Sequence, residues 1–174
     1  RTTTRPRRAG TPPVIGHIHG IAAAPRGQEP GGRVLIGAHY GLFAVEVTGD
    51  DAGTVTRVGD SAADFMALTA AATDDQPGRL LASGHPEVTD TSQPVNLGLM
   101  ESLDGGKSWE SLSLEGAADF HALEHTPQRT WGIDSVTGGL LSSVDERSWQ
   151  TVHGEALLDL AVDPADPDRV LATT

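Results

Sequence analysis

The sequence predicts an all-β protein assembled from repeated four-stranded antiparallel sheets. Short runs of alternating apolar residues recur along the chain, as expected for strands with one buried face. Turn-forming residues separate these runs, since 21 Gly and 11 Pro occur among the 174 residues. Two similar turn motifs end in Trp109 and Trp149, which lie 40 positions apart, and a period of about 40 to 50 residues is typical of stacked-sheet repeats.

The first repeat contains four candidate strands. Its alternating opening run, residues 17–25, is stopped by a proline, and the apolar runs 33–39 and 41–47 are close enough to form a hairpin. Residues 54–59, rich in β-branched side chains and ended by a glycine, supply the fourth strand.

The same pattern restarts three times. The strands expected in the second repeat are 64–68, 79–85, 97–102 and 109–112, and those in the third are 119–123, 130–134, 139–142 and 149–152. The fourth repeat has only two, 157–164 and 169–174. Aligning the opening strands places four residues in one column, with spacings of 47, 55 and 38: His19, Met66, His121 and Asp159.

The most specific motif is Ser102–Trp109, which reads Ser-Leu-Asp-Gly-Gly-Lys-Ser-Trp. Asp104 can accept hydrogen bonds from backbone N–H groups farther along the turn, and Gly105 and Gly106 allow the positive φ angles of a tight hairpin. Ser143–Trp149 is a shorter copy that has lost one residue and the glycine. The chain is therefore predicted to form two equivalent hairpins.

Both stretches resemble the Asp-box, or BNR repeat, of sialidase-like β-propellers. The structural Asp-box positions that carry the resemblance are Ser102, Asp104, Gly106, Ser108, Trp109, Ser143, Asp145 and Trp149. The His-x-His-Gly opening at 17–20 and the Gly-x-His-Tyr-Gly-Leu-Phe segment at 37–43 are similar to exported bacterial BNR-repeat proteins commonly labelled glycosyl hydrolases. The resemblance implies a β-propeller of four-stranded antiparallel blades and a secreted protein, extracellular or in the cell envelope.

This fold divides the chain into a tail and a partial propeller. Residues 1–13, rich in Arg, Thr and Pro, are predicted to be a disordered tail, and residues 14–174 the propeller. The blades are expected at approximately 14–60, 61–114, 115–154 and 155–174, the last incomplete. About three and a half blades cannot close a ring of four to eight. We therefore expect a fragment, with self-association that completes the ring as an alternative.

Composition excludes several classes of partner. Twenty-four acidic and 12 basic residues give a formal charge of −12, the wrong sign for binding nucleic acid. No run of 18 apolar residues predicts a membrane span. Zero cysteines exclude disulfides, thiolate metal sites and cysteine nucleophiles. A glycan or a protein remains as a ligand.

Six potential metal ligands fall on the strands expected to line the propeller axis, or on the hairpins above them. They are His17, His19, His39, Met66, His85 and His121. Imidazole and thioether groups together favour a soft or borderline ion, so copper is expected ahead of zinc. The minimal expected set is His17, His19 and His39, all in the first blade. The alternative is that these histidines are structural residues of the channel.

The sequence leaves two functions open. The first is a binding or scaffold module, with the metal site at the propeller mouth. The second is a glycoside hydrolase, which needs two placed carboxyl groups, and the candidates are Asp64, Asp119 and Glu87. Sialidase activity is not expected, because the Arg-Ile-Pro opening of that family is absent and Tyr40 is the only tyrosine.

Overall fold

The computed structural model describes residues 13–24 and 32–174, so most of the predicted tail at 1–13 lies outside the described residues. Within these ranges the chain forms three four-stranded antiparallel sheets and one two-stranded sheet. The first sheet contains β1 (Ile18–Ala23), β2 (Arg33–Ala38), β3 (Gly41–Glu46) and β4 (Val55–Val58). The second contains β5 (Asp64–Ala70), β6 (Leu80–His85), β7 (Leu99–Ser102) and β8 (Glu110–Ser113).

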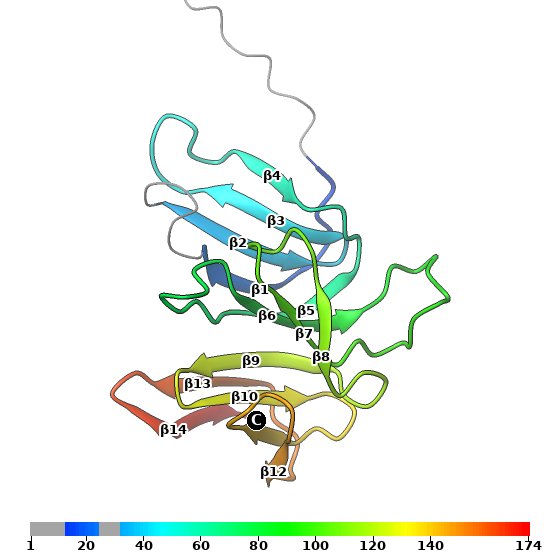
Figure 1. The fold of residues 1–174 in the computed structure, drawn as a ribbon, viewed down its shortest axis with the longest axis vertical. Helices are drawn as coiled ribbons and strands as arrows, with labels where there is room; N and C mark the ends of the chain where they lie inside the picture. Colours follow the sequence, from blue (N-terminus) through cyan, green and yellow to red (C-terminus); the bar gives the residue numbers. More distant parts are fainter. Residues whose placement is uncertain (1–12, 25–31) are drawn as a thin grey trace, which may run out of the picture.

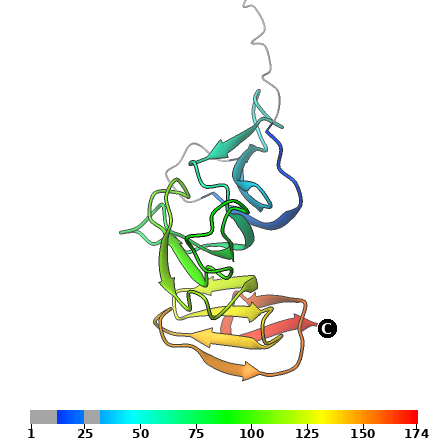
Figure 2. The same cartoon turned by 90° about the vertical axis from the view of Figure 1, so that its right-hand side faces the viewer.

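The third sheet contains β9 (Phe120–Thr126), β10 (Arg129–Asp134), β11 (Leu140–Ser143) and β12 (Gln150–His153), and the last β13 (Asp159–Asp163) and β14 (Asp166–Thr173). Each full sheet keeps its strands in chain order, and the first strands lie against one another in the series β1, β5, β9 and β13 (Figure 1). The first three sheets follow one another along the long axis of the molecule, and the two-stranded sheet lies at the level of the third, as the turned view also shows (Figure 2). The predicted fold class, a β-propeller of four-stranded antiparallel blades, is confirmed.

The hydrophobic core lies between the sheets. One cluster joins the first and second sheets through Leu35 and Phe65, which are both almost fully buried. A second joins the second and third sheets through Leu81 and Phe120, and a third packs Leu160 of β13 on the third sheet. Each blade therefore buries its apolar face only by stacking on a neighbour, as expected of a repeat architecture.

The Ser102–Trp109 hairpin is held by the side chain of Asp104. Its carboxylate accepts hydrogen bonds from the Ser102 hydroxyl at 2.9 Å, from the Lys107 and Ser108 amides at 3.0 Å each, and from the Ser108 hydroxyl at 2.7 Å. Partial desolvation acts to raise the pKa of Asp104, but these bonds outweigh it and lower the pKa to about 2. The turn also requires Gly106, because its φ is +90° and a Cβ at this position would collide with the Leu42 side chain.

The shorter copy keeps the same hydrogen bonds. Asp145 accepts from the Ser143 hydroxyl at 3.0 Å and from the Ser148 amide at 2.7 Å, and these bonds hold its pKa well below the usual range. The tryptophans of both hairpins are half-buried and pack on phenylalanines: Trp109 on Phe65 and Trp149 on Phe120, with ring centroids 5.1 and 4.8 Å apart.

A charged network joins the second and third sheets. Arg79, only 9% exposed, donates to Glu101 at 2.6 Å and forms a two-bond ion pair with Glu146 of the shorter hairpin. Burial acts to raise the pKa of Glu146, but hydrogen bonds with His125 and Arg79 outweigh it and lower the pKa to about 2. The network fixes the shorter hairpin to the preceding sheet.

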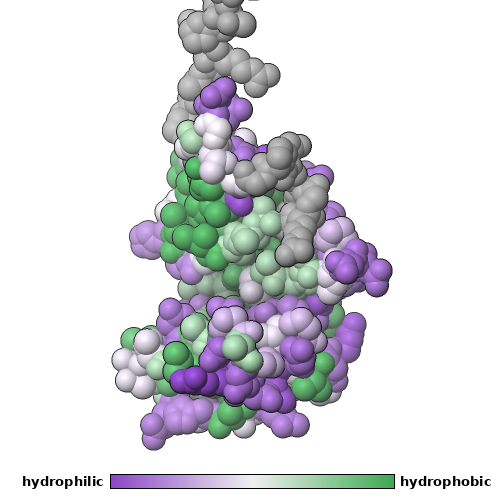
Figure 3. All heavy atoms as spheres, turned by 90° about the vertical axis from the view of Figure 1, so that its left-hand side faces the viewer, coloured by the Kyte–Doolittle hydropathy of each residue, from purple (hydrophilic) through white to green (hydrophobic). Residues whose placement is uncertain are grey.

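The outer surface is uneven in polarity. In the view of Figure 3, apolar residues gather over the upper half, where the first sheet lies, and hydrophilic residues cover most of the lower half. Among the described residues, no helix is long and apolar enough to cross a membrane.

Candidate metal centre

Three side chains meet at the boundary between the first and second sheets. His19 comes from β1, His39 from the turn after β2, and Asp64 begins β5. Their candidate ligand atoms all lie within 4.8 Å of one another. The Asp64 Oδ2 atom is 2.7 Å from His39 Nδ1, and its Oδ1 atom is 3.4 Å from His19 Nε2. We call His19, His39 and Asp64 the first cluster.

The next sheet boundary carries a second cluster, made of His85, Asp119 and His121. His85 ends β6, Asp119 directly precedes β9, and His121 lies on β9. The Asp119 Oδ2 atom is 2.8 Å from His121 Nε2 and 3.6 Å from His85 Nε2. Ser135 donates its hydroxyl to the same oxygen at 2.5 Å. The two clusters therefore repeat at successive blade boundaries with the same donor types.

A recurring β-bulge sets the direction of three side chains near these clusters. The register of the first strand against the second shifts by one residue in each full sheet, which leaves one residue without a direct partner: His19, Met66 or His121. These residues are the aligned column found in the sequence. A bulge turns the side chain of its extra residue and is common beside functional sites. Two residues of this column, His19 and His121, belong to the two clusters.

Backbone and second-layer contacts hold the second cluster in place. Asp134 accepts a hydrogen bond from the Asp119 amide at 2.9 Å, and Ser83 accepts one from the Phe120 amide at 3.0 Å. His85 places its Nδ1 atom 2.9 Å from the Val95 carbonyl oxygen. Because a carbonyl oxygen only accepts, the Nδ1 atom donates this hydrogen bond. The bond orients the ring so that its Nε2 atom faces the Asp119 carboxylate.

Three buried polar atoms in the clusters have no hydrogen-bond partner: His19 Nε2, Asp64 Oδ1 and Asp119 Oδ1. Asp119 is only 4% exposed, so this oxygen is deeply withdrawn from solvent. A buried polar atom without a partner is costly and is expected to have a function or a bound ion or water. All three atoms belong to residues of the two clusters, and two of them, His19 Nε2 and Asp64 Oδ1, face each other at 3.4 Å.

The residues predicted from the sequence are divided between and around these clusters. Four of the six candidate ligands lie in them: His19, His39, His85 and His121. His17 is exposed, with its ring centroid 6.3 Å from that of His19, and it belongs to neither cluster. Met66 also belongs to neither cluster. It stands at the bulge two residues after Asp64, just as His121 stands two residues after Asp119. Each cluster is completed by an aspartate that the sequence suggested only as a catalytic group.

The three candidate carboxylates do not converge on one point. Asp64 belongs to the first cluster and Asp119 to the second, each against two histidines. Glu87 lies exposed on the loop between β6 and β7, where it accepts a hydrogen bond from Thr89 at 3.1 Å. The sequence did carry a signal for this grouping. An aspartate stands two residues before the aligned column in both Asp-Phe-Met and Asp-Phe-His.

A groove of about 260 Å³ runs along the first strands and is lined by one histidine of each cluster, His19 and His121. Glu124 of β9 and Asp159 of β13 also line the groove. Burial raises the pKa of Glu124, and the nearby Asp159 carboxylate raises it further. The groove therefore borders one histidine of each cluster and two acidic residues.

Comparison with known proteins identifies the fold. No protein-family model and no curated protein matches this chain. Among solved structures, an ancestral GH74 enzyme is similar at a TM-score of 0.61 and 14% identity, over 93% of this chain and 22% of that one. YCF48 bound to D1 peptide is similar at a TM-score of 0.50 and 13% identity, over 89% of this chain and 45% of that one. A computationally designed protein, Ika8, is similar at a TM-score of 0.50 and 10% identity, over 90% of this chain and 43% of that one. The chain thus spans less than half the length of these structures, and the likeness establishes a β-propeller fold.

Proposed function

We propose that this chain is part of an exported β-propeller of the BNR/Asp-box family, and that it binds a divalent transition-metal ion in each of the two clusters. The observation that carries the proposal is the second cluster. There the Nε2 atom of His85 and the Oδ2 atom of Asp119 face each other at 3.6 Å, and the second oxygen of that carboxylate is buried without a hydrogen-bond partner. A bound cation would satisfy both groups.

The distances suit a small ion. Ligand atoms bound at about 2.0 to 2.1 Å in a tetrahedral site lie roughly 3.3 Å apart. The separations of 3.4 Å between His19 and Asp64 and 3.6 Å between His85 and Asp119 are close to that spacing. The shorter contacts of His39 and His121 with their aspartates, 2.7 and 2.8 Å, are hydrogen-bond distances that would lengthen when an ion enters.

Two imidazoles and one carboxylate are the donors of three-ligand zinc sites that keep one position open. The same donors bind Cu(II), which a given nitrogen and oxygen site holds more tightly than zinc. Met66 follows Asp64 at the bulge position of the second sheet, and a thioether donor there would favour copper over zinc. Zinc and copper are therefore the two ions to test.

Calorimetric titration of tag-free protein with Zn(II), Cu(II) and Cu(I) tests the proposal directly. We expect two ions per chain in the wild type, and one per chain in His39→Ala or His85→Ala. His153→Ala is the matched control, because that histidine is exposed and belongs to neither cluster. It should keep both sites. Binding no tighter than millimolar, or equal binding in all four proteins, would leave these histidines as structural residues.

The same aspartates would serve the rival function, glycoside hydrolysis. Under the metal proposal, Asp119→Asn lowers metal affinity at the second cluster, and the protein turns over no glycoside. A panel of chromogenic glycosides separates the two functions. Turnover that is abolished in Asp64→Asn or Asp119→Asn, while metal binding is unchanged, would replace the metal proposal with the hydrolase one.

A further inference from the structure

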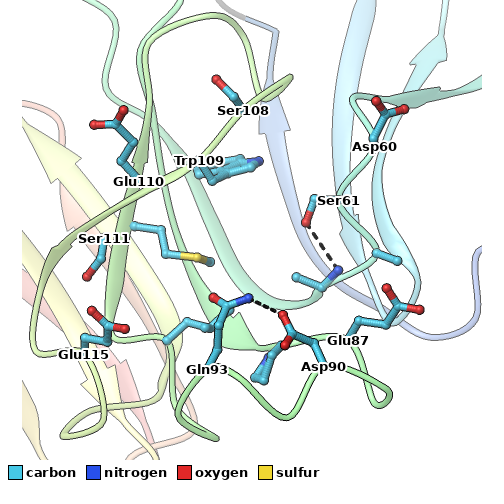
Figure 4. Close-up of a pocket in the computed structure, with 15 residues that line it drawn as sticks. Asp60, Ser61, Glu87, Asp90, Gln93, Ser108, Trp109, Glu110, Ser111 and Glu115 are labelled. Carbon is cyan, nitrogen blue, oxygen red and sulfur yellow. Dashed lines mark hydrogen bonds between the residues drawn. The ribbon is translucent and has the colours of Figure 1, made fainter.

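A cavity of about 310 Å³ opens between the first and second sheets, and none of the cluster residues lines it. Three segments form its walls: the link 60–63 between β4 and β5, the loop after β6, and the beginning of β8 (Figure 4). These segments are brought together only by the packing of the first two sheets.

The floor of the cavity is apolar and includes an aromatic ring. Leu97 and Met100 line it and are 5% and 7% exposed, and both belong to the core between the first two sheets. Trp109 lines it as well, and its indole N–H is already donated to the Gly106 carbonyl at 3.1 Å. The indole and the thioether therefore offer a polarisable apolar surface and no free donor.

The rim carries charge of one sign only. Five carboxylates line the cavity, and no lysine, arginine or histidine does: Asp60, Glu87, Asp90, Glu110 and Glu115. Across residues 13–24 and 32–174, none of the five forms a salt bridge. Hydrogen bonds from Ser92 and Gln93 lower the pKa of Asp90, so this carboxylate stays ionised. Among the described residues, the Arg57 guanidinium approaches the cavity by donating to the carbonyl oxygen of the lining residue Ser61 at 3.1 Å, but it forms no salt bridge with the five carboxylates.

We propose that this cavity docks a basic segment of another polypeptide, with one arginine or lysine inserted. The aliphatic stem of that side chain would lie on Leu97, Met100 and Trp109, and its cationic end would reach the rim. Five carboxylates without a salt bridge exceed what one small amine can neutralise, whereas a segment with several basic residues complements them. The charge of the rim and the apolar floor together select this occupant over a glycan or a free amine.

Titration with two blocked pentapeptides, Ala-Arg-Ala-Arg-Ala and its citrulline counterpart, tests the proposal. Binding is followed by the NMR signals of the Trp109 indole N–H and the Met100 methyl group. We expect both signals to move with the arginine peptide, and the citrulline peptide and free n-butylamine to bind at least about tenfold more weakly, because citrulline carries no charge and n-butylamine carries only one.

Two charge-matched variants separate docking from general attraction to an acidic protein. Glu87→Gln with Glu110→Gln removes two rim charges, and Asp74→Asn with Asp75→Asn removes two exposed charges outside the cavity. The rim variant should weaken peptide binding about tenfold, and the control by less than about threefold. The proposal is overturned if both variants weaken peptide binding equally, or if only NMR signals of other residues move. It is also overturned if the citrulline peptide binds as tightly as the arginine peptide, or if no peptide binds tighter than millimolar. Tighter binding of n-butylamine would assign the cavity to small amines instead.

Discussion

Asp64 and His85 lie directly opposite each other in the β5–β6 ladder, yet their side chains serve different clusters. Asp64 contacts His19 and His39 at the first sheet boundary, and His85 faces Asp119 at the second. Directly opposite residues of antiparallel strands have Cα atoms only about 4.5 to 5.5 Å apart. One cross-strand pair therefore links the two candidate metal sites.

This proximity predicts that the two ions bind unequally. Two dications held by neighbouring strands repel each other, and the repulsion is only partly offset by the two aspartates. We expect wild-type titration to resolve two steps, the second at least about tenfold weaker than the first. In His39→Ala, which lacks the first cluster, a single step should remain. Two identical and independent sites in the wild type would contradict the link through Asp64 and His85.

Metal affinity should also fall in acid. A histidine binds a metal ion through a neutral nitrogen, so protons compete with the ion for His19, His39, His85 and His121. We expect thermal stabilisation by saturating zinc at neutral pH, about 2.7 kcal/mol when zinc is present at 100 times its dissociation constant. The stabilisation should shrink as the solution is acidified through the range in which histidines titrate. A zinc-induced shift in melting temperature that does not vary with pH would point to other ligands.

Glu146→Gln should destabilise the protein by about 1 to 3 kcal/mol, because the buried guanidinium of Arg79 loses one of its two carboxylate partners and keeps Glu101. The pKa of Glu146 is lowered to about 2 from a usual value of 4.5, so its contribution is complete above pH 4.5 and is lost as pH falls toward 2. Urea unfolding at several pH values measures both effects. The variant should show a smaller loss of stability than the wild type across that range.

Asp104→Ala should cost about 1 to 3 kcal/mol, because the amides of Lys107 and Ser108 lose their acceptor in the turn. Asp74→Ala, at an exposed position outside the hairpin, is the matched control and should change stability by less than about 0.5 kcal/mol. Chemical denaturation compares the two. If both variants unfold at the same urea concentration as the wild type, the carboxylate does not hold the turn.

Trp109→Ala should cost about 3 kcal/mol, the lower end for loss of a packed aromatic ring, since the indole is only half-buried. The ring packs on Phe65, so Trp109→Phe should restore most of the loss. Thermal unfolding followed by circular dichroism is the measurement. An unchanged melting temperature in Trp109→Ala would show that the ring adds nothing to the contact between the first two sheets.

Local patterns in the sequence determined most of the fold. Alternating apolar runs and Gly-rich turns located the strands, because side-chain alternation and turn geometry depend on residues close together in the chain. The hairpin at Ser102–Trp109 was predictable for the same reason, since all the bonds of Asp104 reach residues within four positions. The period of the two hairpins then indicated stacked blades.

Only the tertiary structure decided how the functional side chains are grouped. Alignment of the repeats placed His19, Met66 and His121 in one column, but the bulges that turn them are visible only in the strand pairing. Asp64 meets His39 across a blade boundary, 25 positions away, and Arg79 meets Glu146 at a separation of 67. Such contacts depend on the offset between one twisted sheet and the next. Packing of the whole interface sets that offset, and no short segment of sequence encodes it.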